Sequence, residues 1–227
     1  MFAKQLRLLG NFGDLEIREP TPLADAKLPE PRIDVNDKWL APVATTTRFD
    51  RASRCYGRAY RDIVRGFVGD FASAPDVVLR PIDESQLRLA IDWAVSRDVA
   101  LVPYGGGTSV VGGVEVAERE LYSGVACLDL RGLDRVLEVD DVSMSARIQA
   151  GATGPRLEEQ LRPHGLTLRF FPQSFELSTL GGWIATRAGG HFATLLTHID
   201  DLVRSTRMLS PRGVFESRRL PASGAGP

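Results

Sequence analysis

A glycine-rich segment that follows a short apolar run constrains this chain more than any other feature. Residues 99–103 are apolar, and Tyr104, three glycines, Thr108, Ser109, two valines and two further glycines follow. The apolar run predicts a buried strand. Glycine accepts positive φ and lets a ligand approach the backbone, and successive free N–H groups form a concave nest for an anion. The segment predicts a phosphate-binding loop, with a tight turn as the alternative.

The common phosphate-binding loops do not match this segment. A Walker loop ends in Gly-Lys-Ser/Thr, and no lysine occurs here. The dinucleotide fingerprint G-x-G-x-x-G requires a helix directly after the loop, whereas Gly112 and Gly113 come next. The glycine run therefore has to be interpreted together with the chain around it.

Composition excludes several classes of protein. The chain has 227 residues, enough for one large or two small domains, and a net charge of −1 that gives no indication of a nucleic-acid partner. Two cysteines are too few for a disulfide framework, and three histidines show no metal-ligand spacing. No transmembrane run or secretory signal is apparent, so we expect a cytoplasmic protein without bound metal.

The first third of the chain is expected to lead into the main domain. Prolines interrupt residues 1–40, which we interpret as an irregular lead-in, and residues 41–74 as a helical lead-in. Six arginines recur three or four apart on one expected helix face: Arg48, Arg51, Arg54, Arg58, Arg61 and Arg65. A solvated basic face is one interpretation. A surface for an anionic ligand, a phospholipid surface or an acidic partner is the other.

From residue 75 a strand–helix–strand unit is expected. Residues 77–79 predict a strand, Asp83 is suited to cap a helix from Glu84 to Arg97 with Gln86 at capping-box spacing, and residues 99–103 form the next strand. Such a unit predicts a parallel pair with a right-handed crossover.

After the glycine loop the pattern becomes more mixed. We expect a strand at 125–130, a hairpin at 136–148, a helix from Pro155 to near Gly165 and a small-residue helix opened by Ser178 or Thr179. A final hairpin is expected from 200–209 and 214–217. The fold class is α+β, with two subdomains, 75–118 and 119–227.

Three segments in this order resemble a known flavoprotein family. They are residues 103–109, residues 172–187 (PQSFELSTLGGWIATR) and residues 199–203 with Met208 and 211–213 following. Together they resemble the vanillyl-alcohol oxidase/p-cresol methylhydroxylase flavoproteins, most closely the alkyldihydroxyacetonephosphate synthases and their bacterial relatives. The lead-in at 50–58 resembles the same subgroup. The resemblance implies the two-subdomain FAD-binding domain of the p-cresol methylhydroxylase type.

The resemblance also assigns cofactor residues. The first loop would hold the FAD pyrophosphate through backbone donors, and two later stretches would line the rest of the flavin. The implied residues are Pro103, Tyr104, Gly105, Gly106, Gly107, Thr108, Ser109, Gln173, Ser174, Phe175, Glu176, Leu177, Ser178, Thr179, Thr186, Arg187, Ala188 and Gly189.

Hydroxyl groups within this set are candidate donors to the flavin. Outside the set, the small residues Gly181 and Gly182 are candidates for close approach by its planar ring. Arg187 is suited to a phosphate or to a reduced, anionic flavin, or alternatively to a surface ion pair. Some members of the superfamily tether the flavin through a histidine in the first loop. None stands at 107–109, so we expect non-covalent FAD.

The chain also departs from the family pattern. Relatives have a Ser-Gly near 189–190 and a Tyr-Gly pair before the Ile-x-Asp motif, and residues 189–198 (GGHFATLLTH) lack the latter. His191 and His198 match no catalytic position of the family and are interpreted as ordinary loop histidines. A Gly-Ser-Glu-Gly-Thr-Leu-Gly segment and a substrate-binding cap domain, which carries the catalytic residues, would follow in relatives. The expectation is an FAD-binding domain truncated at its C-terminus, as a fragment or a shortened gene product.

Three functions remain open. The first is part of an alkyldihydroxyacetonephosphate synthase-like enzyme of ether-lipid biosynthesis, exchanging an acyl for an alkyl chain through a flavin adduct. The second is an FAD-dependent 2-hydroxy-acid dehydrogenase or oxidase of the D-lactate or glycolate kind. The third is a non-catalytic FAD-binding remnant. In the first two, a small-molecule or lipid-linked substrate would bind through the cap domain, and a homodimer is possible.

Overall fold

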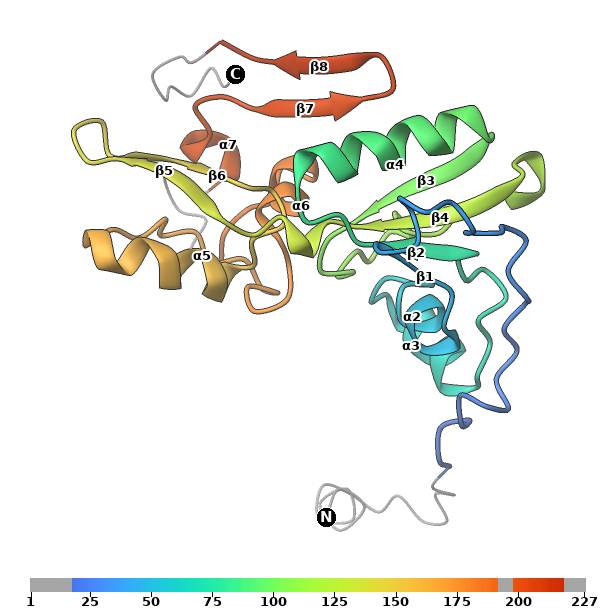
Figure 1. Cartoon of the computed structure of the whole chain (residues 1–227). Helices are drawn as coiled ribbons and strands as arrows, with labels where there is room; N and C mark the ends of the chain where they lie inside the picture. Colours follow the sequence, from blue (N-terminus) through green and yellow to red (C-terminus); the bar gives the residue numbers. More distant parts are fainter. Residues whose placement is uncertain (1–17, 192–197, 219–227) are drawn as a thin grey trace, which may run out of the picture.

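The computed structural model describes residues 18–191 and 198–218, and its helices and strands gather into two main parts (Figure 1). The first contains β1 (Ala44–Thr45), α2 (Arg48–Ser53), α3 (Tyr60–Phe67), β2 (Val77–Leu79), α4 (Glu84–Ser96), β3 (Val99–Tyr104) and β4 (Gly124–Asp129). The second contains β5 (Val136–Asp140), β6 (Ser145–Ile148), α5 (Gly154–Leu161), α6 (Leu180–Ala185), α7 (Ile199–Leu202), β7 (Arg207–Ser210) and β8 (Gly213–Glu216).

The first part is built on a four-stranded sheet of order β1-β2-β4-β3. β2 and β3 both pair in parallel with β4, while β1 pairs antiparallel with β2. The expected strands therefore run parallel, but they are not neighbours, because β4 lies between them. The sheet also extends beyond the subdomain boundary expected near residue 118, since β4 ends at Asp129.

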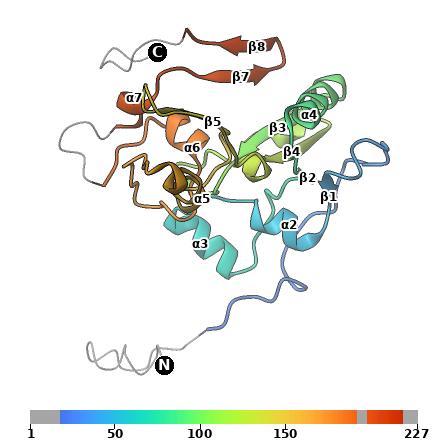
Figure 2. The ribbon, with the colours of Figure 1, turned by 60° about the vertical axis from the view of Figure 1, so that its left-hand side comes forward.

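Helix α4 covers one face of this sheet, and α2 lies on the other (Figures 1 and 2). Trp93 and Ala94 of α4 pack with Val77 and Leu79 of β2, while Val78 faces the opposite side with Cys127 and Tyr104. This alternation is the period of two expected of a strand. Asp83 caps α4 as expected, because its side chain accepts a hydrogen bond from the Gln86 N–H.

The lead-in contributes to the core of the first part. Leu40 is fully buried in the cluster beneath α4, and Ile33 and Val35 pack against that cluster. Arg32 forms an ion pair with the buried carboxylate of Asp76 at 2.9 Å. Although prolines keep this segment irregular, it is part of the packed domain.

The arginine pattern expected to form one helix face is divided between two helices. Arg51 and Arg54 are buried, so the solvated-face interpretation is wrong for them. Arg51 donates to the carbonyls of Pro75 and Pro29, and Arg54 donates to Asp129. These side chains hold α2 against the sheet and do not form a docking surface for an anion.

The second part packs around its own core. The hairpin β5–β6, α5 and α6 surround Leu157, Phe170 and Trp183. Pro155 stands in the first turn of α5, and Gly165 ends the following 3₁₀ turn with φ of +68°, as the sequence predicts.

The C-terminal hairpin is shorter than expected. β7 begins only at Arg207 and pairs with β8, whereas residues 199–202 form helix α7. The expectation of an extended arm from Asp200 is therefore wrong, because Asp200 and Asp201 lie in the first turn of this helix, where carboxylates are favourable.

Candidate functional site

The glycine loop leaves the carboxyl end of β3 and packs against the segment 177–179. A β-carbon on Gly106 would overlap the Leu177 carbonyl oxygen, and one on Gly105 would overlap the Thr179 hydroxyl. Gly107 has φ of +64°, and a β-carbon there would meet the Tyr104 hydroxyl. Gly105 and Gly106 are therefore required to join the first two motifs, whereas Gly107 is required within the first motif itself.

The loop backbone nonetheless remains available for a ligand. Across the described ranges, the N–H groups of Gly106, Gly107, Thr108 and Ser109 donate no hydrogen bond, whereas the Ser109 carbonyl accepts one from Arg58 N–H at 2.6 Å. Adjacent N–H groups without partners around a left-handed residue suit an anion. This arrangement fits the pyrophosphate of a dinucleotide.

Two hydroxyl groups of the second motif make hydrogen bonds within the protein. The Ser178 hydroxyl donates to the Ser174 carbonyl at 2.8 Å and accepts from the indole N–H of Trp183 at 2.6 Å. The Thr186 hydroxyl donates to the Gly182 carbonyl at 2.9 Å. These hydrogen bonds fix α6 and the loop before it, and the flavin contacts expected of Ser178 and Thr186 stay a prediction.

Several other expected cofactor residues also have side chains that face the protein. Tyr104 is buried and donates to the Ser53 carbonyl at 3.3 Å. The Phe175 ring packs 5.3 Å from the ring of Phe171 and 6.4 Å from that of Trp183. Gly181 approaches Ala150 closely, so its small size also serves packing within the protein. These residues shape the backbone that would face a cofactor.

Residues 186–189 meet the third motif. Arg187, which has φ of +50°, is highly exposed and donates to the Asp200 carboxylate at 2.7 Å. The Ile199 N–H donates to the Ala188 carbonyl at 3.0 Å, and Gly189 forms an isolated bridge with His198. Arg187 thus forms the surface ion pair that was the alternative expectation. Helix α6 connects these contacts of residues 187–189 to the contact between the glycine loop and residues 177–179.

The remaining expected cofactor positions provide accessible surface. Ser174 is half-buried, and the exposed members of the set are Pro103, Gln173, Glu176, Leu177, Thr186, Arg187 and Gly189. Of the stretch that departs from the family pattern, residues 192–197 lie outside the described residues.

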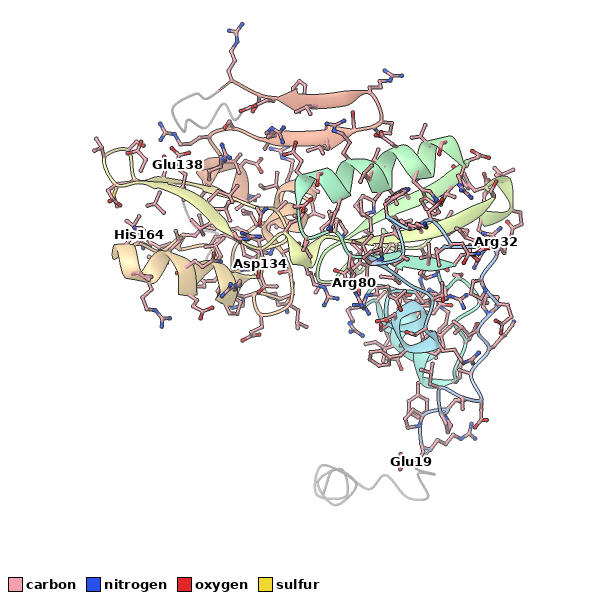
Figure 3. The ribbon with its side chains drawn as sticks, in the orientation of Figure 1. Glu19, Arg32, Arg80, Asp134, Glu138 and His164 are labelled. Carbon is pink, nitrogen blue, oxygen red and sulfur yellow. The ribbon has the colours of Figure 1, made fainter. Side chains whose placement is uncertain are left out.

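A charge network beneath the glycine loop was missed by the sequence analysis. Asp129, at the carboxyl end of β4, accepts from Arg54 at 2.9 Å and from Arg131 at 2.6 Å. Arg80, which follows β2 and is labelled in Figure 3, forms an ion pair with Asp50. The Arg131 guanidinium lies 5.9 Å from the centre of the Tyr104 ring. The sequence did carry a signal for this network. Arg80 directly follows β2 and Asp129 is the last residue of β4, and the carboxyl ends of these parallel strands lie at one edge of the sheet.

The electrostatics of this network favour ionised carboxylates. Burial opposes the charge on Asp129, but hydrogen bonds from Arg131 and Arg54 and the charge of Arg131 hold its pKa below the usual range. Burial raises the pKa of the Tyr104 phenol, so this hydroxyl stays protonated. Near neutral pH, Asp129 therefore stays ionised and Tyr104 stays protonated, and the network fixes the base of the loop.

A separate groove of about 550 Å³ lies between β5 and α5, with Glu138 and His164 in its lining (Figure 3). It includes none of the expected cofactor residues. Among the described residues, no group of three or more histidine, cysteine, aspartate or glutamate side chains is arranged to hold a metal ion. Nor does any helix in these residues have the length and apolar character to cross a membrane.

Comparison with known proteins agrees with this geometry. Residues 75–217 match the family described as the FAD binding domain. The chain is 37% identical over 176 residues to an alkyldihydroxyacetonephosphate synthase of Dictyostelium discoideum, a match that covers 78% of this chain and 28% of the relative. It is 30% identical to a mitochondrial D-lactate dehydrogenase [cytochrome] of Arabidopsis thaliana, a match that covers 67% of this chain and 26% of the relative.

Solved structures give the same result. One alkyldihydroxyacetonephosphate synthase superposes with a TM-score of 0.84 at 28% identity, over 95% of this chain and 41% of the other. The chain spans about three-tenths of the length of the curated synthases it matches. Because the family model matches residues 75–217 and the fold is similar, this chain belongs to the FAD binding domain family, and it resembles the N-terminal part of the alkyldihydroxyacetonephosphate synthases.

Proposed function

We propose that this chain binds FAD non-covalently and forms the flavin-binding part of an enzyme of the alkyldihydroxyacetonephosphate synthase type. The observation that carries the proposal is the row of N–H groups at 106–109 that donate no hydrogen bond within the described structure. These groups would bind the pyrophosphate. The exposed side chains of the second motif, Gln173 and Glu176 among them, would line the remainder of the cofactor.

The chain's own residues contribute position and electrostatics. Contacts from Leu177 and Thr179 hold the glycine loop in place, and Tyr104 supports it from below. Bound FAD would supply the electron sink for the chemistry, as cofactors do generally. The Arg187 side chain is 81% exposed, so once released from its pair with Asp200 its guanidinium would be free to balance negative charge on the cofactor.

The substrate belongs to the same proposal. A ketone phosphate carrying a lipid chain is favoured because the curated relatives with the higher identities, from 34% to 37%, are alkyldihydroxyacetonephosphate synthases. The substrate would bind through a further domain, as the part of the relatives that this chain matches is under one third. A role in ether-lipid synthesis, a cytoplasmic location and a homodimer complete the proposal.

A second candidate is an FAD-dependent 2-hydroxy-acid dehydrogenase. The similarity to a D-lactate dehydrogenase favours it, although this match has lower identity and covers less of the chain. Reduction of bound flavin by D-lactate, in a preparation that also contains the substrate-binding domain, would select this candidate over the synthase.

The experiment that tests the cofactor proposal compares FAD with riboflavin, which lacks the pyrophosphate. The purified chain is incubated with each compound, desalted and examined for absorbance near about 450 nm, which reports retained flavin. We expect FAD to be retained and riboflavin to be lost, because the loop N–H groups recognise an anion. Equal retention of both compounds, or of neither, would refute the assigned role of the loop.

Acid precipitation tests the non-covalent attachment. Denaturation abolishes the binding site, so flavin held only by non-covalent contacts should pass into the supernatant. Yellow colour in the protein pellet would contradict this part of the proposal.

A further inference from the structure

The glycine loop is held at its far end by two residues of the lead-in. The Arg58 N–H donates to the Ser109 carbonyl at 2.6 Å, and a β-carbon on Gly57 would overlap the same carbonyl oxygen. Gly57 is buried, whereas Arg58 is exposed. This backbone contact brings Arg58 next to Ser109, where the row of loop N–H groups without partners ends.

The side chain of Arg58 differs from those of the other five arginines between residues 48 and 65. Those five have partners within the protein: Arg48 and Arg51 donate to backbone carbonyls, Arg54 binds Asp129, and Arg61 and Arg65 pair with Asp62 and Glu115. Within residues 18–191 and 198–218, the Arg58 guanidinium forms no ion pair and donates no hydrogen bond. Its charge is therefore available to a ligand.

This charge lies close to the turn of the glycine loop. A β-carbon on Gly107 would meet the Tyr104 hydroxyl, so this phenol stands directly at the turn. Burial raises the pKa of Tyr104, and the positive charges of Arg131, Arg54 and Arg58 oppose that rise. Arg54 and Arg131 already share a carboxylate beneath the loop. Among the described residues, Arg58 is the one of these three cations that no carboxylate neutralises.

The two features together suit a diphosphate better than either does alone. The loop N–H groups are dipoles that direct themselves at an anion but carry no net charge. A guanidinium adds a full positive charge and a planar fork of donors that matches phosphate oxygens. A pyrophosphate carries negative charge on both of its phosphates, so a cation beside the loop would strengthen its binding.

We propose that the Arg58 guanidinium binds the pyrophosphate held by the glycine loop. The inference rests on the proposed function for the identification of the ligand as FAD. Arg58 would then act twice, since its main-chain N–H positions Ser109 and its side chain binds the anion. The family match begins at residue 75, so it does not include Arg58.

Isothermal titration calorimetry on the full chain tests the inference with two probes, FAD and inorganic pyrophosphate. The variant R58Q removes the charge and keeps the main-chain N–H that binds Ser109. We expect R58Q to bind each probe at least about tenfold more weakly than the original chain, because hydrogen bonds between charged groups are the strong ones. The difference should shrink at high salt, where the charge is screened.

Two further variants separate this role from a general effect of charge. R162Q makes the same change at an exposed arginine in the 3₁₀ turn after α5 and should bind both probes as the original chain does. R58K restores the charge without the planar fork and should recover part of the affinity. Thermal unfolding without ligand verifies that each variant is folded, and we expect R58Q to keep the melting temperature of the original chain.

The outcomes distinguish this inference from the proposed function. FAD binding that R58Q leaves unchanged, or that R58Q and R162Q weaken equally, would overturn the inference and leave the cofactor proposal standing. Pyrophosphate binding that depends on Arg58, in a chain that does not bind FAD, would uphold the inference and refute the cofactor. Binding of neither probe by the original chain would refute both.

Discussion

Gly106 lies so close to Leu177 that a β-carbon at position 106 would overlap the carbonyl oxygen of residue 177. This contact joins two motifs that are about seventy residues apart in the sequence. The glycine is therefore required by the protein even before a cofactor binds. Substitutions in this loop affect stability and flavin binding together.

Gly106→Val should abolish FAD retention and also lower the melting temperature of the chain without FAD. The added side chain forces the glycine loop away from residues 177–178, and overpacking of this kind typically costs about 1–3 kcal/mol. Absorbance after desalting and thermal unfolding measure the two effects. Gly66→Ala is the control, because a β-carbon there makes only ordinary contact with Phe71. Retained flavin with an unchanged melting temperature would contradict the role of Gly106.

Ser178→Ala should destabilise the chain through Trp183. Without the hydroxyl, the indole N–H of Trp183 loses its 2.6 Å acceptor in a buried place. A buried donor without a partner costs roughly 1–3 kcal/mol. Urea unfolding followed by tryptophan fluorescence measures the loss. Thr108→Ala, which removes a half-buried hydroxyl that makes no hydrogen bond within the described residues, should change the free energy of unfolding by less than about 0.5 kcal/mol. A Ser178→Ala chain of unchanged stability but weaker FAD binding would show that the hydroxyl contacts the cofactor instead.

Asp129→Asn should lower stability more than removal of an exposed carboxylate does. Arg54 and Arg131 would lose their charged partner, and breaking a buried ion pair costs about 3 kcal/mol. Asp134→Asn is the control, since Asp134 pairs with the half-exposed Arg156 and such surface pairs contribute less than about 1 kcal/mol. Denaturant unfolding at neutral pH compares them, and equal losses would contradict a structural role for the network.

Stability should fall on acidification. Arginine partners hold the pKa of Asp76 and Asp129 below the usual range despite burial. The unfolded chain then binds more protons than the folded one as pH drops, so the stabilisation is complete above the unfolded pKa of about 3.9 and is lost as pH falls through the folded values. Urea unfolding between about pH 3 and pH 6 measures this dependence.

Asp76→Asn should reduce the slope of that acid dependence, because it removes one of the depressed carboxyl groups. Its carboxylate also accepts from the Val125 N–H at 2.7 Å, so overall stability should fall in the same variant. An unchanged slope would assign the acid sensitivity to other groups.

Both cysteines should be unreactive in the folded chain. Cys55 and Cys127 are buried, and burial raises the pKa of Cys55 to about 12 and that of Cys127 further. Since the thiolate is the nucleophile, Ellman's reagent at about pH 8 should modify neither thiol before unfolding and both after it. Rapid modification of one thiol in the native chain would contradict the packing of that residue.

Local sequence signals predicted much of the secondary structure correctly. The Asp83 cap, the strand that delivers the glycine loop, the hairpin after residue 136 and the turn at Gly165 all depend on residues close together in the sequence. The family resemblance, carried by three motifs in the right order, was confirmed by comparison with known proteins. It identified the FAD binding domain without any tertiary information.

The errors share a physical cause. Arg54 was assigned to a solvated face because its spacing matches a helix stripe, but its partner Asp129 lies 75 residues away. The arm expected from Asp200 to Leu209 begins only at Arg207, and residues 199–202 form α7, which packs its Ile199 into the second core. Spacing along the chain carries no information about such distant partners, and these decide whether a polar residue is buried.

By itself, the sequence determined most of the elements and their order, because capping, periodicity and glycine-rich turns act over a few residues. Three motifs in the right order determined the family. Tertiary structure decided that β4 lies between β2 and β3, and that Gly105 and Gly106 pack against residues 177–179. It also decided that the apolar side chains of α3, such as Ile63 and Phe67, are exposed. Each of these depends on contacts between segments far apart in the chain. Such contacts stabilise the protein only once folding has brought the segments together, so spacing along the chain does not predict them.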